Sequence, residues 1–163
     1  MMTAPHLPRL GRTLRDMLHA RRFGALGTLD ASAGVFVSMV PYAIDTSTRR
    51  LVLHVSGLAA HTANMQAEPR VSLLITGADA ADEPVHDLPR VTLLALAATP
   101  EPASDAWASA RAAYLARFPD VEDMTALPDF RFVTLDVIGA RQVAGFGSAR
   151  SVMAHELAQV LGA

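Results

Sequence analysis

Residues 23–56 read FGALGTLDASAGVFVSMVPYAIDTSTRRLVLHVS, and the fold class follows from this part of the chain. It contains three short, mainly apolar runs: Phe23–Leu29, Val35–Ile44 and Leu51–Ser56. The segments between them, Asp30–Gly34 and Asp45–Arg50, hold residues that are typical of turns. These links are too short for a helical crossover, so the three runs predict an antiparallel β-meander.

The rest of the chain adds strands and a few helices to this meander. Further strands are expected at Val71–Thr76, Val91–Ala98, Phe130–Ile138 and Arg141–Phe146. Helices are expected at about Leu7–Arg22, between Ser56 and Pro69, at Ser104–Phe118 and at Ser151–Leu161, with Ser104 and Ser151 as N-caps. Six or seven short strands with mostly local connections predict a mainly-β protein with flanking helices. Such a chain forms a small antiparallel barrel, here as one domain over residues 1–163.

Composition excludes several classes of chemistry. The chain has 163 residues, of which 51% are hydrophobic and 18% charged, a balance typical of one folded domain. It contains no Cys, which excludes disulfide scaffolds, thiol nucleophiles and iron–sulfur clusters. All 14 basic residues are Arg, which excludes a Schiff-base Lys and the Lys of a nucleotide-binding P-loop.

Charge and hydropathy patterning bear on partners and location. A formal net charge of −2 argues against nucleic-acid binding, which usually depends on a basic excess. No segment reaches the ~18 consecutive apolar residues of a membrane span. Residues 1–22 lack the apolar centre of a secretory signal. We therefore expect a cytoplasmic protein that binds neither nucleic acid nor membrane.

Common catalytic and metal-binding signatures are absent from the sequence. There is no G-x-S-x-G elbow, no P-loop and no G-x-G-x-x-G motif. His155-Glu-Leu-Ala-Gln159 begins like a zinc-protease motif, but Gln159 stands where the second His is needed. We therefore assign no catalytic residue and expect no metal site formed by side chains alone.

The most informative short segment is LVLHVSGLAAHTAN at residues 51–64. A strand ends at Ser56 and a helix follows closely, so unpaired backbone N–H groups and a partial positive charge gather at this turn. Four polar side chains join them there: Ser56, His61, Thr62 and Asn64. Together these groups predict a site for a phosphate or another anion. In the alternative interpretation, Ser56 only caps the helix, and Thr62 and Asn64 face water.

Arg90 is a second candidate. It stands at the entry to the apolar strand Val91–Ala98, where a barrel edge would hold its guanidinium beside a carbonyl-rich ring or a carboxylate. The alternative is an ordinary surface Arg at a strand end. Asp129, which follows Pro128, is interpreted as a turn residue.

Eight segments, in this order, resemble the pyridoxamine 5′-phosphate oxidase-related family of FMN-binding split barrels, and more closely its haem-utilisation branch. They are Gly27–Asp30, Val37–Ala43, Ser56–Asn64, Glu68–Leu74, Arg90–Leu93, Tyr114–Pro119, Asp129–Phe132 and Gly145–Ala149. The resemblance spans about Leu10 to Ala149. It implies a Greek-key antiparallel split barrel that forms a homodimer, with two flavin sites at the subunit interface.

The resemblance also implies which residues hold the cofactor. In such family members the strand matching Val37–Pro41 runs along the flavin, the turn matching Ser56–Asn64 holds the phosphate, and the position matching Arg90 approaches the ring. The segment matching Gly145–Ser148 of the second copy would close the site. The implied cofactor-binding residues are Val37, Ser38, Met39, Val40, Ser56, Leu58, His61, Thr62, Asn64, Arg90 and Phe146.

The chain departs from the family pattern in three places. The oxidase holds the FMN phosphate with an Arg-Lys pair, where this chain has Ala60-His61. The oxidase's C-terminal Arg-Leu-His motif is missing. The iron-binding His of the haem branch has no easy counterpart, because His155 comes too early. Asp129, in contrast, matches an aspartate of the haem branch.

These observations lead to a first hypothesis and its alternatives. The first is an FMN-dependent oxidoreductase acting on a small-molecule substrate, in which the flavin performs the electron chemistry and Arg90 stabilises the reduced ring. The second is a haem-binding or haem-utilisation protein that acts at the dimer interface. A non-catalytic flavin-binding dimer, and F420 in place of FMN, are the further alternatives.

Overall fold

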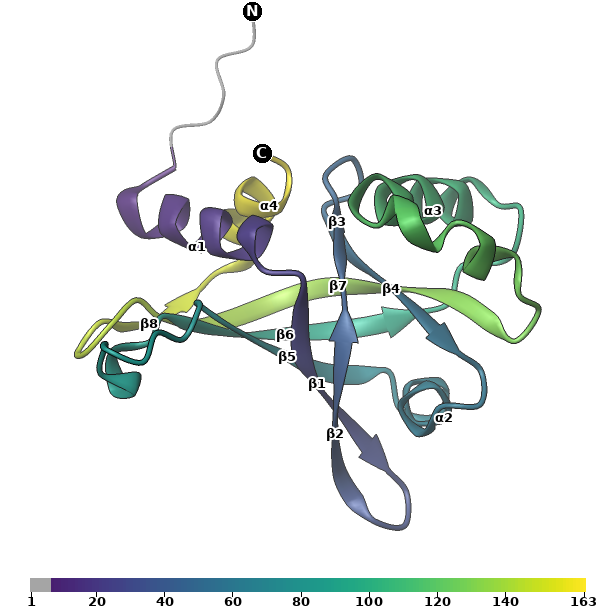
Figure 1. Cartoon of the computed structure of the whole chain (residues 1–163), viewed down its shortest axis with the longest axis horizontal. Coiled ribbons are helices and arrows are strands. Elements are labelled where there is room, and N and C mark those ends of the chain that lie inside the picture. The colour runs from purple at the N-terminus through teal and green to yellow at the C-terminus, as the bar shows by residue number, and fades with distance from the viewer. Residues whose placement is uncertain (1–6) are drawn as a thin grey trace, which may run out of the picture.

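The protein is built on one antiparallel sheet of eight strands that curls around a hydrophobic interior (Figure 1). The structure is a computed structural model that describes residues 7–163. Residues 1–6, which include His6 and the start of the segment that lacks the apolar centre of a secretory signal, lie outside the described part. The strands are β1 Phe23–Asp30, β2 Gly34–Pro41, β3 Ala43–Asp45, β4 Arg50–Ser56, β5 Arg70–Thr76, β6 Arg90–Ala98, β7 Phe130–Val143 and β8 Ala149–Val152. The helices are α1 Arg9–Ala20, α2 Ala60–Ala67, α3 Asp105–Arg117 and α4 Ala154–Leu161, with short 3₁₀ turns η1 Val85–Asp87, η2 Pro119–Val121 and η3 Asp123–Ala126.

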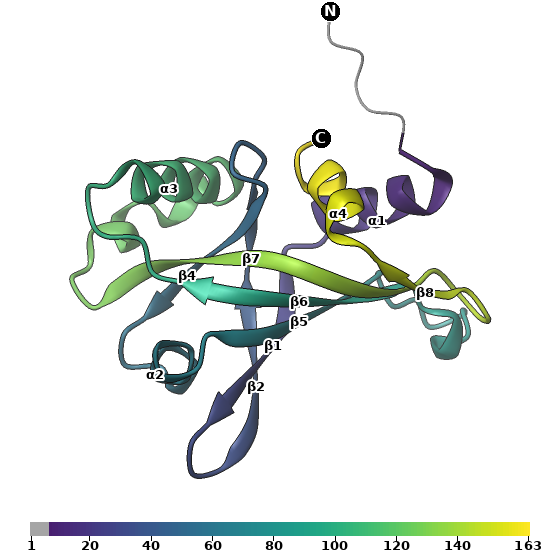
Figure 2. The same ribbon diagram turned by 180° about the vertical axis from the view of Figure 1, so that it is seen from behind.

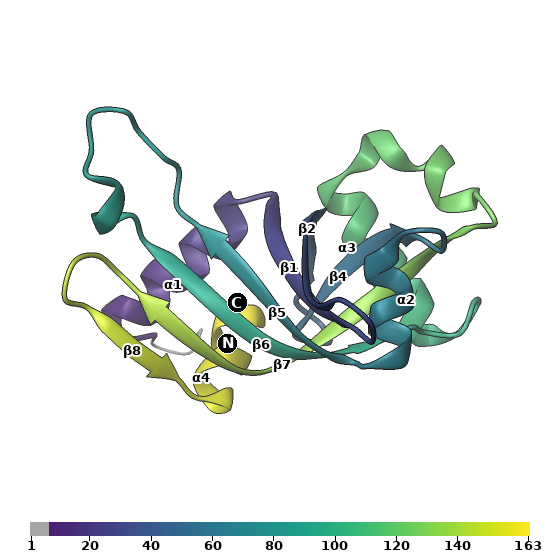
Figure 3. The same cartoon turned by 90° about the horizontal axis from the view of Figure 1, so that it is seen from below.

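The strand order is β2-β1-β5-β6-β7-β4-β3, and β8 pairs with the end of β7. Hairpins join β1 to β2, β3 to β4 and β5 to β6, whereas the β1–β5 and β4–β7 pairs bring together strands that are distant in the sequence. Helices α1 and α4 pack against each other beside one half of the sheet, and α3 covers β3 and β4 (Figures 1 and 2). Seen from below, α2 lies next to the β1–β2 hairpin and the end of β4 (Figure 3). The predicted mainly-β antiparallel fold with flanking helices is confirmed.

The predicted strand Val35–Ile44 is in fact two strands, because the chain changes partner at Tyr42. Strand β2 pairs with β1 as far as Pro41, and β3 pairs with β4 from Ala43 onward. Between them the Tyr42 side chain turns into the core, where it is 1% exposed and its hydroxyl donates to the carbonyl of Leu18 at 2.6 Å. The apolar run hides this break, since Tyr is itself favourable in a strand.

The predicted strands Phe130–Ile138 and Arg141–Phe146 form one continuous strand, β7, which ends at Val143. Its register against β6 shifts by one residue at Ile138, which forms a β-bulge. The bulge and the neighbouring Gly139 therefore bend the strand without ending it.

The last predicted helix, Ser151–Leu161, begins later than expected. Ser151 belongs to β8, and α4 starts at Ala154 with Met153 at its N-cap and no side-chain cap bond. Pairing with β7 takes precedence over helix formation here, because it places Val152 in the core at 2% exposure.

Two clusters of buried side chains hold these elements together. The larger fills the curl of the sheet with leucines from four strands and α1: Leu26, Leu53, Leu73, Leu93 and Leu14. The smaller packs α3 against β4 and β7 through Val52, Tyr114, Phe118 and Phe132. Ser104 caps α3 as predicted, since its Oγ accepts the N–H of Trp107 at 3.2 Å. Within residues 7–163, none of the helices has the length and apolar character needed to cross a membrane.

Candidate functional site

The predicted anion site is the turn that connects β4 to α2. Ser56, the last residue of β4, organises this turn: its Oγ accepts the N–H of Leu58 at 3.1 Å, and its carbonyl accepts that of Ala59 at 3.2 Å. Ala59 is the N-cap of α2 and makes no side-chain cap bond. The backbone N–H groups of Ala60 and His61 have no hydrogen-bond partner within residues 7–163, so both are available to an anion.

His61 links the turn to β2, the strand at one end of the sheet. Its Nδ1 lies 3.0 Å from the Oγ of Ser38 on β2, while its Nε2 is buried and has no partner among the described residues. Burial lowers the pKa of His61, so the imidazole is neutral at pH 7. The unpartnered Nε2 is a polar atom that a ligand could satisfy.

Thr62 and Asn64 support the turn from inside the protein. Thr62 is 1% exposed, and its Oγ1 donates to the carbonyl of Ser56 at 2.6 Å. Asn64 is 6% exposed, and its side-chain amide donates to the Oγ1 of Thr28 on β1 at 3.0 Å. The alternative in which these side chains face water and Ser56 caps α2 is therefore wrong. Both side chains instead fix the turn relative to β1 and β4.

Asp129 and Arg131, near the start of β7, complete the turn. The Asp129 carboxylate accepts the Ser56 hydroxyl at 3.2 Å, and its carbonyl accepts the N–H of Gly57 at 2.6 Å. The Arg131 guanidinium occupies the space that a Cβ on Gly57 would fill, and it forms no ion pair within residues 7–163. Arg131 was not predicted as a site residue, because only its register opposite Val55 of β4 brings it here.

Strand β2 offers a free edge and two different faces. Val37 and Met39 are 61% and 64% exposed on the outer face, whereas Ser38 and Val40 point toward His61 and the core. Within the described residues β2 pairs only with β1, so its other edge is open to a ligand or to another chain.

Arg90 and Phe146 lie far from the turn in the same chain. Arg90 begins β6, and a nine-residue strand puts its two ends ~26 Å apart. The far end of β6 is the one that approaches α2 (Figure 1). The Arg90 guanidinium donates to the carbonyl of Leu88 at 3.0 Å, and Phe146 is 85% exposed in the β7–β8 hairpin. One copy of the chain therefore does not bring these two residues to the other predicted site residues.

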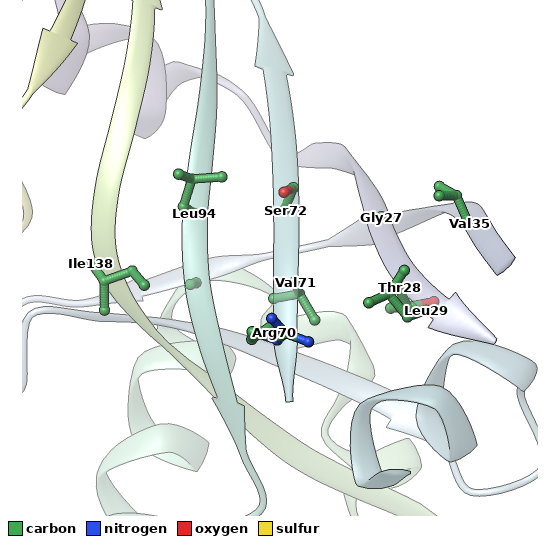
Figure 4. Close-up of a pocket in the computed structure, with 10 residues that line it drawn as sticks. Gly27, Thr28, Leu29, Val35, Arg70, Val71, Ser72, Leu94 and Ile138 are labelled. Carbon is green, nitrogen blue, oxygen red and sulfur yellow. The ribbon is translucent and has the colours of Figure 1, made fainter. Parts of the chain in front are cut away.

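The outer face of the sheet carries an apolar hollow of about 450 Å³ (Figure 4). It crosses the sheet from β1 and β2 to β7, and its walls include Val35, Leu94 and Ile138, which are 75%, 48% and 54% exposed. The charge of Arg70 at its rim is balanced by Glu68 at 2.9 Å. An exposed apolar face of this kind is typical of a surface that another molecule covers.

His54 is a core residue and not part of the site. Its ring packs against Phe130, Phe132 and Tyr114 at centroid distances of 5.1, 4.7 and 5.7 Å, and burial lowers its pKa. Within residues 7–163, no group of three His, Asp or Glu side chains is placed to hold a metal ion.

Known proteins resemble this chain in family, in sequence and in structure. Residues 10–144 match the family described as pyridoxamine 5′-phosphate oxidase. The heme oxygenase HutZ of Vibrio cholerae is 27% identical over 150 residues, which cover 91% of this chain and 84% of HutZ. The structure of a heme binding protein from Mycobacterium smegmatis is 30% identical with a TM-score of 0.82, and the match covers 94% of this chain and 61% of that one. The structure of a putative pyridoxamine 5′-phosphate oxidase from Listeria innocua shares the fold at 14% identity, with a TM-score of 0.64 over 84% of this chain and all of that one.

The family match includes nearly all of the sheet and the turn between β4 and α2. The curled antiparallel sheet with its flanking helices agrees with the split-barrel fold of these relatives. The chain therefore belongs to the pyridoxamine 5′-phosphate oxidase family.

Proposed function

We propose that this protein binds haem at the turn between β4 and α2 and takes part in haem utilisation. The observation that carries the proposal is the set of groups at this turn: two free backbone N–H groups, the Arg131 guanidinium and the unpartnered Nε2 of a neutral His61. The two relatives that are 27% and 30% identical are named as a heme oxygenase and a heme binding protein, which supports the same ligand here.

The charge of the turn suits a carboxylate. Haem carries two separate propionates with one negative charge each, whereas a phosphate monoester such as that of FMN carries −1.5 to −2 at pH 7. Arg131 is the cation at the turn, and Ala60-His61 adds no second fixed positive charge. Asp129, bonded to Ser56, adds a negative charge of its own. This balance favours one propionate over a phosphate.

Flavin binding is the second candidate, and the family match over residues 10–144 favours it. In this case the N–H groups of Ala60 and His61 and the Arg131 guanidinium hold the phosphate, and β2 lies along the ring. FMN would supply hydride or electron transfer, and the protein would be a flavin-dependent oxidoreductase for a small-molecule substrate. A flavin-binding protein without activity, or an F420 protein, would use the same turn.

We also propose that two copies of the chain form the complete site. Arg90 pairs with Val143, which leads into the β7–β8 hairpin that carries Phe146, and the other end of β6 approaches α2, so a second copy is needed to bring both residues to the turn. The apolar outer face with its 450 Å³ hollow is the surface that this second copy would cover.

Light scattering after gel filtration tests the dimer. We expect a mass of twice the 17.3 kDa of one chain. Leu94→Glu places a charge in the hollow and should give monomers, whereas Ala112→Glu places the same charge at an exposed position of α3 and should leave the dimer intact. A wild-type mass of 17.3 kDa at tens of micromolar would contradict the proposal.

Absorption spectroscopy tests the ligand. The purified protein is titrated with haem and, separately, with FMN, and we expect a saturable shift of the haem Soret band. Arg131→Gln should weaken haem binding at least tenfold, because a hydrogen bond to a charged group contributes about 1.5–3 kcal/mol. Arg9→Gln, which removes an exposed charge at the start of α1, serves as the control.

Each outcome of the titrations decides between the candidates. Binding of FMN without haem would establish the flavin candidate and overturn the first, and binding of neither would overturn both. His61→Ala and His155→Ala identify the iron ligand, since loss of that ligand changes the Soret position and not only the affinity.

A further inference from the structure

We infer that a second pocket, at the junction of α1 and β1, binds a small carboxylate with an apolar body. The pocket has a volume of about 310 Å³. Its charged rim is made by Arg21 and Arg22, and its walls by Phe23, Met39, Pro41 and Phe118. The pocket shares Met39 and Pro41 with the strand expected to lie along a flavin, and none of its lining residues belongs to the β4–α2 turn.

The two arginines that line this pocket have no acidic partners in the described part of the chain. Arg117, at the end of α3, donates to the carbonyl of Arg21 at 3.0 Å, which ties the backbone beside the pocket to α3. None of Arg21, Arg22 and Arg117 has a carboxylate within 4.0 Å among residues 7–163. Clustered cations with no counter-charge favour binding of an anion.

Stacking holds two of these guanidinium groups at the pocket. The Cζ of Arg21 lies 5.8 Å from the centre of the Phe23 ring, and that of Arg22 lies 5.4 Å from the centre of the Phe118 ring. A guanidinium stacked on a ring keeps its N–H edge free, and that edge matches the two oxygens of a carboxylate. The two long side chains are therefore partly ordered before a ligand binds, which reduces the entropy cost of binding.

The walls of the pocket require an apolar body on the ligand. Phe23 and Met39 are 49% and 64% exposed, although both are large hydrophobic side chains. The volume lies at the lower end of the roughly 300–1,000 Å³ that is usual for small-molecule sites. An inorganic anion would leave these apolar walls exposed to water, and a nucleotide would be too large for the pocket. An aliphatic or aromatic monocarboxylate satisfies both the rim and the walls.

Isothermal titration of octanoate and benzoate into the full chain tests this site. We expect saturable binding of both acids, and at least tenfold weaker binding of the uncharged analogues octanamide and benzamide. Arg21→Gln and Arg22→Gln should each weaken octanoate binding at least tenfold, which corresponds to about 1.4 kcal/mol. Arg9→Gln should leave it unchanged, because Arg9 lies twelve residues before Arg21, roughly 18 Å away along a helix.

A second measurement does not depend on any variant being folded. Octanoate added to wild-type protein with labelled methionine methyl groups should shift the signal of Met39 and leave that of Met153, which is 62% exposed elsewhere, in place. The inference is overturned if amides bind as tightly as acids, if Arg9→Gln weakens binding as much as Arg22→Gln, or if Met39 does not respond.

Discussion

Gly57 is the position of the β4–α2 turn at which a side chain conflicts with its surroundings. A Cβ there would lie 2.9 Å from the carbonyl of Asp129 and would run into the Arg131 guanidinium. Arg131 can swing aside, but the Asp129 carbonyl is backbone and accepts the Gly57 N–H at 2.6 Å. Gly57→Ala must therefore push the start of β7 away from the turn. We expect it both to destabilise the fold and to displace the cation of the anion site.

The cost of Gly57→Ala comes from overpacking, because Gly57 does not have a positive φ. An added methyl group that forces a backbone shift costs ~1–3 kcal/mol, and weakening of the Asp129 hydrogen bond adds to it. We expect the free energy of unfolding to fall by about 2–3 kcal/mol. Urea unfolding followed by the fluorescence of Trp107, the single Trp, measures this change by linear extrapolation. Haem or FMN affinity of the same variant should fall at least tenfold.

Gly139→Ala is the matched control for this prediction. Gly139 also lies in β7 and has no positive φ, but a Cβ there meets nothing within 4 Å. Its free energy of unfolding should stay within about 0.5 kcal/mol of wild type. If Gly57→Ala is as stable as Gly139→Ala, the close approach of β7 to the turn is not a constraint and the reasoning fails.

Three other substitutions test the rest of the fold. Glu156→Gln removes a carboxylate that accepts two hydrogen bonds from Arg150 at 2.7 and 2.9 Å, and we expect the free energy of unfolding at neutral pH to fall by about 1 kcal/mol. Arg150 lowers the pKa of Glu156, so the wild type but not the variant should lose this stabilisation as the pH falls below the ordinary Glu value of 4.5. Burial lowers the pKa of His54, so as the pH falls below 6.5 the unfolded chain takes up a proton before the folded chain does, and the free energy of unfolding should fall. His54→Phe should flatten this dependence, which urea unfolding at neutral and mildly acidic pH measures. Tyr42→Phe loses the 2.6 Å bond to Leu18, which costs about 1 kcal/mol and should lower Tm by about 2–4 °C in calorimetry; an unchanged Tm would show that the bond adds no stability.

Sequence patterns predicted well those elements whose partners are close in the chain. The β1–β2 hairpin follows from the turn-forming residues after β1, and the Oδ1 of Asp30 accepts the N–H groups of Ser32 and Ala33 at 2.8 and 2.7 Å. The predictions are wrong where contacts with residues distant in the sequence determine the secondary structure. Tyr42 interrupts an apolar run because its hydroxyl reaches α1, and β8 forms where a helix is expected because β7 pairs with it.

In the candidate site, too, the contacts that are local in the sequence were predicted and the distant ones were not. Ser56, His61, Thr62 and Asn64 are local to one turn, and the sequence predicted that they lie together. Their partners come from elsewhere: Thr28 from β1, Ser38 from β2, and Asp129 and Arg131 from β7. Strand register decides these contacts, and register cannot be derived from the pattern of one strand alone. The placement of Arg90 and Phe146 beside the turn depends on a second copy, and it stays a prediction.

The bulge at Ile138 has a consequence for changes in chain length. Before it, odd-numbered residues of β7 such as Val133 and Leu135 face the interior, whereas after it the even-numbered Ala140 and Gln142 do. The one extra residue resets the alternation, so that both halves of a long strand present their buried side chains to the same side. Val137 and Gly139 already pair with the adjacent Ala95 and Leu94, so deletion of Ile138 would leave regular pairing behind it. Gln142 would still face the interior and keep its 3.1 Å bond to the carbonyl of Leu10. At the bulge β7 can therefore lose one residue without inverting the side chains that follow, whereas a single deletion within the regular pairing beyond it would invert them.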